Sequence, residues 1–402
     1  MTDFDAIFRN ATLVDGERAH VGIAAGLIAA VVPASEPAPP AGEDTDLAGA
    51  MLVPGFVEGH IHLDTSFYGD AWKPHLPCTN GFDVRERVAF QMQNIANAAP
   101  MDQRARNQLD LCIAQGSTSM RSHVMIDADV GLRHLETILA VREEYAELID
   151  IELVAFPQSG ILASPGTAQL MDEAIALGCD LVGGLDPASF DRDIEGHLDA
   201  VFDIAERRGV GVDIHLHDGG SLGLFTIEQI AARTRRLGLG GRVAISHAYG
   251  LGDIASDQQR RIAATLAEAG VAIMTNAPGA VNFPPVTILR QAGVTVFSGS
   301  DNIRDSWWPY GDGDMLRRAN IIGYRSGFYE DWELASAFDV VTSAGAKALG
   351  LSGYGIAPGC KADFVTFRAQ HVPEAVVAVP GARSVYKSGR LVARDGKRVG
   401  VN

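Results

Sequence analysis

The stretch that decides the fold is Gly55-Phe56-Val57-Glu58-Gly59-His60-Ile61-His62-Leu63-Asp64. An apolar run that starts at Met51 leads into two histidines two residues apart, a spacing that places both imidazoles on one face of a β-strand. Two neutral imidazole nitrogens are half of a typical four-ligand zinc site. Paired histidines in a strand can equally be ordinary polar packing, so the choice depends on the rest of the chain.

Composition limits the kinds of partner. The 402 residues are 47% hydrophobic, and 33 Lys and Arg against 50 Asp and Glu give a formal charge of −17, which disfavours nucleic acid and anionic membranes. The four cysteines form no CxxC pair, no signal-like segment opens the chain, and no apolar run approaches the ~20 residues of a membrane helix. We expect a cytoplasmic homo-oligomer that binds a small molecule, with no nucleic-acid or membrane partner.

Eight apolar, β-rich runs alternate with helical patterns in the middle of the chain. From the second run on, successive starts lie 23 to 32 residues apart, the length of one βα unit. The runs are Phe56–His62, Ser119–Met125, Ile151–Pro157, Leu181–Leu185, Val212–His217, Val243–His247, Val271–Thr275 and Val294–Ser298. This count predicts an α/β protein with a (β/α)8 TIM barrel over residues 55–354, with a lid and a helix near Val84–Asn97 after the first strand.

Short strands with turn signals occur at both ends of the chain. Examples are Val21-Gly22-Ile23 near the N-terminus and Ser384-Val385-Tyr386-Lys387 near the C-terminus. Neither end is long enough to build a good core alone. We therefore predict that residues 1–54 and 355–402 together form one small β-sandwich beside the barrel.

Polar residues gather where the predicted strands end, which is where a TIM barrel carries its chemistry. These residues are His60, His62, Gln158, His215, His217, Asp218, His247 and Asp301. Histidines and an aspartate from four strand ends predict one site for a divalent metal ion. His123 on the second strand could be a participant or a packing residue, and His20, His75, His134, His197 and His371 are interpreted as surface or loop residues.

These motifs resemble the amidohydrolase superfamily over essentially the whole chain, from Val53-Pro54-Gly55 through His60-Ile61-His62 to Pro358-Gly359-Cys360-Lys361-Ala362-Asp363. Within it, the chain resembles the cytosine deaminase branch at His62-Leu63-Asp64-Thr65, at Val154–Gln158 and at Asp301–Pro309. It also resembles N-isopropylammelide isopropylaminohydrolases at Gly183–Ala188, at His215–Asp218 and at Ser300–Asp305.

The resemblance implies a set of roles. His60, His62, His215 and Asp301 would hold one zinc or iron ion, which lowers the pKa of a bound water toward ~7. The remaining residues would act on the substrate: Asp301 as base, His247 polarising the attacked group, His217 or Asp218 protonating the departing nitrogen, and Gln158, Asn302, Trp307 and Thr65 binding the ring.

Departures from the two patterns leave the substrate open. Cytosine deaminases carry glutamate at Asp218 and a second aspartate at Asn302, whereas the triazine enzymes carry lysine at Thr65. The fourth run ends in Gly-Gly-Leu-Asp-Pro without a lysine, so no bridging carbamate can form, which favours one metal ion. Histidine is the better acid near neutral pH, and we favour His217 as the donor with Asp218 behind it.

The sequence thus predicts a metal-dependent aminohydrolase that removes ammonia or an amine from a cytosine-, triazine- or pterin-like heterocycle. A hydantoinase-like hydrolysis of a cyclic amide is the alternative enzyme. The missing fourth-strand lysine and the Pro-Gln and Trp motifs count against it. A third possibility from another class is a catalytically dead metal-binding protein, which the full ligand set disfavours.

Overall fold

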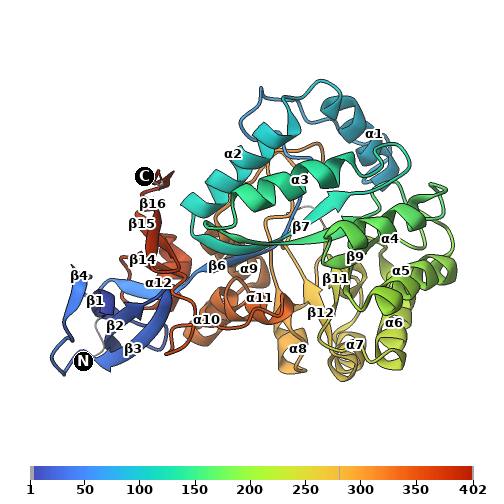
Figure 1. Cartoon of the computed structure of the whole chain (residues 1–402). Coiled ribbons are helices and arrows are strands. Elements are labelled where there is room, and N and C mark those ends of the chain that lie inside the picture. The colour runs from blue at the N-terminus through green and yellow to red at the C-terminus, as the bar shows by residue number, and fades with distance from the viewer. Residues whose placement is uncertain (1–3, 280, 401–402) are drawn as a thin grey trace.

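Eight parallel strands form the centre of the computed structural model, which describes residues 4–279 and 281–400 (Figure 1). Each strand is hydrogen-bonded to its neighbours in chain order. The strands are β6 (Phe56–Ile61), β7 (Ser117–Met125), β8 (Asp150–Phe156), β9 (Leu181–Leu185), β10 (Gly211–His215), β11 (Val243–Ser246), β12 (Val271–Met274) and β13 (Val296–Phe297). All eight coincide with the apolar runs of the sequence, and the predicted (β/α)8 barrel is confirmed.

The barrel closes between its last strand and its first. The backbone amide of Gly59 donates to Ser298 at 3.0 Å, and that of Asp301 donates to His60 at 2.7 Å. Two glycines permit this approach: a Cβ on Gly59 would lie 2.6 Å from the Ser298 carbonyl oxygen, and one on Gly299 would lie 2.4 Å from that of His60. The closure places Asp301 directly beside the paired histidines of β6.

Helices cover the outside of the barrel (Figure 1). They are α2 (Met101–Ala114), α3 (Arg133–Glu144), α4 (Thr167–Leu177), α5 (Ile194–Arg208), α6 (Gly220–Arg236), α7 (Ser256–Ala269), α8 (Val286–Gln291), α9 (Met315–Ser326), α10 (Asp331–Asp339) and α11 (Ser343–Ala348). Gly270 caps the C-terminus of α7 in the left-handed conformation, with a φ of +67°. No helix in the described part of the chain is long and apolar enough to span a membrane.

The segment between β6 and β7 contains a loop and two helices. The predicted helix is α1 (Val84–Ile95), and it is followed by α2. Asp83 caps α1 by accepting a hydrogen bond from the backbone amide of Glu86 at 3.0 Å. Gln91, on the buried side of α1, reaches the carboxyl end of the barrel, so this helix contributes to the site described below.

Strands from both ends of the chain form one further sheet. They are β1 (Phe4–Thr12), β2 (Arg18–Ala24), β3 (Leu27–Pro33), β4 (Ala41–Asp46), β5 (Met51–Pro54), β14 (Phe364–Phe367), β15 (Arg383–Lys387), β16 (Arg390–Arg394) and β17 (Lys397–Arg398). The two ends join where β5 pairs antiparallel with β14, and the sheet divides at β1, which pairs with both β4 and β5. Phe8, Phe364 and Tyr386 pack their rings together in its core. The expected joining of both termini in one β-structure is confirmed. The last short helix, α12 (Val372–Ala378), connects β14 to β15.

Buried ion pairs attach this terminal sheet to the barrel. The Arg383 guanidinium donates to both carboxylate oxygens of Asp314, at 2.7 and 2.8 Å. The Lys387 ammonium donates to Asp363 at 2.7 Å, to Asp150 at 2.9 Å and to the backbone carbonyl of Thr118 at 3.0 Å. Arg383 and Lys387 are almost fully buried, so these contacts fix how the sheet sits against the barrel.

Three histidines that the sequence analysis assigned to the surface or to loops are buried: His20, His134 and His197. Each has a polar partner that explains its burial. His134 on α3 contacts Asp64 at 2.8 Å, His197 on α5 contacts Asp191 at 2.6 Å, and His20 accepts from the backbone amide of Asn10 at 3.1 Å. The prediction was wrong for these residues. The partner of His134 belongs to a distant segment, so its burial leaves no local pattern in the sequence.

Candidate metal centre

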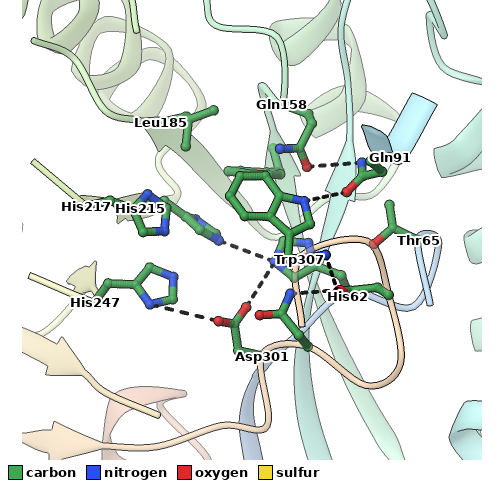
Figure 2. A pocket seen from close by; sticks show the side chains of 13 residues that line it. His62, Thr65, Gln91, Gln158, Leu185, His215, His217, His247, Asp301 and Trp307 are labelled. Carbon is green, nitrogen blue, oxygen red and sulfur yellow. Dashed lines mark hydrogen bonds and ion pairs between the residues drawn. The ribbon is translucent and has the colours of Figure 1, made fainter. Parts of the chain in front are cut away.

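The four predicted ligands meet at the carboxyl end of the barrel. The Nε2 atoms of His60 and His62 lie 3.5 and 3.6 Å from one carboxylate oxygen of Asp301. The Nε2 atom of His215 lies 3.3 Å from that of His62. His60 lies on β6 and His62 directly after it, His215 ends β10, and Asp301 follows β13. All four side chains are buried. Figure 2 shows His62, His215 and Asp301 turned toward a common point.

This arrangement fits a divalent ion. Four donors about 2.1 Å from a tetrahedral ion are separated by about 3.4 Å, which agrees with the observed spacings. His60 Nε2 is buried and has no hydrogen-bond partner among the described residues, although it points at the other donors. Three imidazoles and a carboxylate suit zinc, and they also suit iron.

The electrostatic setting keeps the imidazoles of His62 and His215 neutral, as metal binding requires. Burial, followed by the proximity of His60, lowers the pKa of His62 to about 4. Burial likewise lowers the pKa of His215 well below its ordinary value. Burial alone would raise the pKa of Asp301, but His247 and His60 outweigh it and hold that pKa below its usual range. His62 and His215 therefore present neutral nitrogens beside the Asp301 carboxylate.

Three site residues have left-handed backbone conformations, which are uncommon outside glycine. They are Asp186 after β9, His247 after β11 and Asp301 after β13, with φ values of +37°, +73° and +59°. Each follows a barrel strand, where the chain turns sharply and directs the side chain inward. Strained backbone of this kind concentrates at functional sites, so these three positions mark the carboxyl edge as the working end.

A pocket lies over three of the four donors, those of His62, His215 and Asp301. It is lined by His62, Thr65, Gln91, Phe156, Gln158, Leu185, His215, His217, His247, Asp301, Asn302, Asp305 and Trp307. The structure thus brings together every residue predicted to bind substrate: Thr65, Gln158, Asn302 and Trp307. Phe156 and Leu185 make part of the wall apolar, and Trp307 packs against their cluster.

Hydrogen bonds connect the indole of Trp307 to the side-chain amides of Gln91 and Gln158. Trp307 Nε1 donates to Gln91 Oε1 at 2.7 Å, and Gln91 Nε2 lies 3.5 Å from Gln158 Oε1 (Figure 2). The amino group of Gln158 donates to no side chain or backbone group in the part of the chain that the structure describes, and it remains available as a donor. A planar ring over the metal group would find an aromatic face at Trp307 and a hydrogen-bonding edge at Gln158.

Asp305 supports the loop that carries Trp307. One of its oxygens accepts from the backbone amides of Trp307 and Trp308 at 2.8 and 2.9 Å, and the other accepts from Asn302 Nδ2 at 2.7 Å. Burial raises the pKa of Asp305 to about 7. Through these bonds Asp305 fixes Asn302 as well as Trp307.

His217 and Asp218 face different surroundings. His217 lines the pocket, and its Nδ1 lies 2.8 Å from Asp186, which also accepts the backbone amide of His217 at 2.6 Å. Asp218 is not among the pocket residues, and it contacts Ser189 in the loop after β9. The carboxylate behind His217 is therefore Asp186 and not Asp218 as expected. Burial alone would lower the pKa of His217, but Asp186 and the other nearby carboxylates outweigh it and raise that pKa.

His247 lies between the metal group and His217. Its Nδ1 is 4.0 Å from Asp301, and its ring stacks on that of His217 with centroids 4.5 Å apart. Both nitrogens of His247 are buried without a hydrogen-bond partner among the described residues, so they are free to meet a substrate atom. His123 is fully buried against His60, with ring centroids 4.1 Å apart, and does not line the pocket.

Three residues of the site were missed by the sequence analysis. Asp186 ends the fourth strand, and this position alone could have suggested it. Asn276, which follows β12, donates to the second oxygen of Asp301 at 2.9 Å and holds that carboxylate in place. Gln91 comes from α1, and nothing in the sequence indicates that this helix reaches the pocket.

Comparisons with known proteins agree with this geometry. The model of the "Amidohydrolase family" matches residues 44–393. A curated relative, N-isopropylammelide isopropyl amidohydrolase of Pseudomonas sp. (strain ADP), is 31% identical over 399 residues, 98% of each chain. The chain belongs to the amidohydrolase family.

Two solved structures carry the likeness further. N-isopropylammelide isopropylaminohydrolase from Burkholderia multivorans ATCC 17616 superposes with a TM-score of 0.92 at 40% identity, covering 98% of this chain and 99% of that one. 5-Methylcytosine deaminase from Klebsiella pneumoniae, with bound 5-fluorocytosine, gives 0.85 at 26% identity and 98% of both chains. The suspected branch is confirmed, and the chain is a hydrolase of carbon–nitrogen bonds.

Proposed function

We propose that this protein removes ammonia or an amine from a small cytosine-, triazine- or pterin-like N-heterocycle, using one zinc or iron ion. The ion would be held by His60, His62, His215 and Asp301. The observation that carries the proposal is that one pocket combines this donor group with the Asp186–His217 pair and a flat binding wall. The names of the similar proteins support a substrate of this class.

A bound divalent ion supplies hydroxide near neutral pH by lowering the pKa of its water. Asp301 accepts a proton from the attacking water. His247, whose two ring nitrogens have no hydrogen-bond partner among the described residues, donates a hydrogen bond to the group under attack. His217 carries a proton on Nδ1 toward Asp186, and its Nε2 side gives a proton to the departing nitrogen.

The surroundings of the donor group favour one ion over two. His60, His123 and Asp213 form a second buried group of possible ligands. Both oxygens of Asp213 are engaged, however: one accepts from Arg121 at 3.0 Å and the other from Ser246 at 2.6 Å. Because β9 is followed by Asp186 and provides no lysine, the carbamate that would bridge two ions is also missing.

Substrate orientation follows from the pocket wall. Trp307 offers a face for stacking, and Gln158 offers a donor to a ring carbonyl or ring nitrogen. Thr65 and Asn302 border the same space and distinguish this pocket from those with lysine or a second aspartate at these positions. The exocyclic amine of the substrate would then face His217.

Release of ammonia or amine across a panel of aminopyrimidines, aminotriazines, pterins and purines tests the proposal. The expected result is nitrogen release from at least one ring class, with loss of metal and activity together on chelation. Ring opening of hydantoins without amine release would instead support the cyclic-amide alternative. A protein that binds metal but turns over neither class would be the catalytically dead form.

A further inference from the structure

A line of buried polar groups runs beneath His60, across the inside of the barrel. His60 Nδ1 lies 3.0 Å from the hydroxyl of Ser246, and that hydroxyl donates to Asp213 Oδ1 at 2.6 Å. The other oxygen of Asp213 accepts from Arg121 at 3.0 Å, and Arg121 also donates to Glu152 at 2.6 Å. Four strands contribute to this line: β6, β7, β10 and β11, with Glu152 added from β8. His60, Ser246 and Asp213 are fully buried.

The direction of each hydrogen bond follows from the number of protons available. Arg121 can only donate, so the Asp213 carboxylate beside it can only accept. Ser246 has one hydroxyl proton, which goes to Asp213. The Ser246 oxygen must therefore accept from His60, which places the imidazole proton on Nδ1. The lone pair of His60 is then on Nε2, the buried atom that faces Asp301 and has no other partner among the described residues.

We propose that Ser246 and Asp213 are positioning residues that hold His60 in the tautomer and orientation able to bind the metal ion. This inference rests on the metal site proposed above. Neither residue touches substrate or lines the pocket, and their effect on the reaction would pass entirely through His60. Partners of this kind behind a metal-bound histidine typically contribute 10–100-fold to metal affinity.

His60 and His215 differ in this support. His215 Nδ1 is buried and has no hydrogen-bond partner among the residues that the structure describes. The ion pair of Arg121 and Asp213 at the far end of this line explains why His60 differs from His215. Arg121 holds Asp213 as a fixed carboxylate, and its guanidinium is only 3% exposed. Because Asp213 only accepts, the Ser246 hydroxyl directs its proton toward Asp213, and the Ser246 oxygen is left to accept from His60 Nδ1.

Two serines allow a matched test. Ser246→Ala removes the acceptor for His60, whereas Ser298→Ala removes an equally buried hydroxyl that donates to the Thr275 carbonyl at 2.7 Å and does not contact the ligands. Affinity for Zn²⁺ and Co²⁺ is measured by chelator competition on the full chain. We expect S246A to bind each ion about 10–100-fold more weakly, and S298A to bind like the wild type. Equal affinities in the two variants would overturn the proposal.

Asp213→Asn tests the same line from its other end with nearly unchanged volume. It should weaken zinc binding as well. The S246A/D213N double variant should bind zinc no more weakly than the weaker-binding of the two single variants, because both substitutions act through His60. Losses that simply add would show that Asp213 acts by another route and would refute the line as drawn.

A second readout is the tautomer of His60 in the wild-type protein itself. In metal-free wild-type protein, long-range ¹H–¹⁵N spectra of labelled histidines report the tautomer, with His60 assigned from the spectrum of H60Q. We expect His60 to be protonated on Nδ1, and protonation on Nε2 would contradict the proposal. Should wild type and S298A bind no ion at all, the metal site itself would fall and this inference with it.

Discussion

Two groups of buried polar side chains, one at each end of the barrel, differ in whether their atoms have hydrogen-bond partners. At the amino end, Lys387 has three acceptors and Arg383 has a bidentate carboxylate, so the charges joining barrel and terminal sheet are fully partnered. At the carboxyl end, nitrogens of His60, His215 and His247 are buried without partners among the described residues.

This difference separates stability from function. Buried polar atoms that lack partners cost folding free energy, about 1–3 kcal/mol each, and a protein retains them where a ligand completes their bonds. The strained backbones of Asp186, His247 and Asp301 lie at the same end. We therefore expect changes at the carboxyl end to remove activity, and changes at the amino end to remove stability.

The largest expected effect follows from removing a metal ligand. His215→Ala should lower both the metal content per chain and kcat/KM, the latter by about 10⁴-fold or more, because the activated nucleophile is lost. Elemental analysis and steady-state kinetics measure the two. His197→Asn is the control, since His197 on α5 is equally buried but pairs with Asp191, away from the donor group. Two ions per wild-type chain, or full activity in H215A, would contradict the proposed site.

The next effect distinguishes His217 from its neighbour. His217→Asn should lower kcat by about 10²–10⁴-fold for substrates with a strongly basic leaving amine, because that nitrogen must be protonated as it departs. A substrate with an activated leaving group should be affected much less. Asp218→Asn is the matched control, since Asp218 does not line the pocket and contacts Ser189. The assignment would be reversed if D218N, and not H217N, showed the dependence on the leaving group.

At the amino end, Arg383→Met should lower the free energy of unfolding by about 3–5 kcal/mol, because Asp314 would remain buried without its partner. In folded protein at low temperature, kcat/KM should stay near the wild-type value. Urea unfolding and kinetics test this. The exposed Arg390–Glu147 pair provides a control, and R390M should cost no more than about 1 kcal/mol.

The same measurement bears on the proposed division into residues 1–54 plus 355–402 and residues 55–354. If both ends fold as one unit, removal of residues from Ala362 onward should abolish soluble protein or greatly lower the melting temperature, since β5 loses its partner strand β14. Unchanged melting of the truncated chain would show that the two ends are independent.

The positions of the four ligands could be predicted because each depends on local order in the sequence. An apolar strand of known period sets the face of His60 and His62, and parallel strands bring their carboxyl ends to one edge. Gln158, His217 and His247 follow the same rule. The spacing of the runs was enough to place all of them at one site.

The residues that escaped prediction depend on contacts between distant segments. Asp186 becomes the partner of His217 only because β9 pairs with β10, with Leu185 opposite His215. Gln91 reaches Trp307 because α1 folds back over the barrel, and no periodic pattern encodes that path. The buried His134 was misassigned for the same reason, since its carboxylate partner Asp64 belongs to the segment after β6.

The smallest expected effect is a pH dependence of stability at the amino end. Burial alone would raise the pKa of Asp150, but Lys387 and Lys361 outweigh it and lower that pKa below the ordinary 3.8. A carboxyl with a lowered folded-state pKa stabilises the fold above its unfolded pKa, and this contribution is lost as the pH falls through the folded value.

Asp150→Asn should therefore be less stable than wild type at pH 5 to 7, and the difference should shrink once the pH falls below about 3.8. Because the Asp150 side chain is partly exposed, solvent screening keeps the difference modest. Urea unfolding at a series of pH values measures it, with Glu147→Gln as a control that removes an exposed carboxylate from the same junction. A difference that grows toward low pH would mean that Asp150 is held protonated by its burial and that the lysines do not dominate its surroundings.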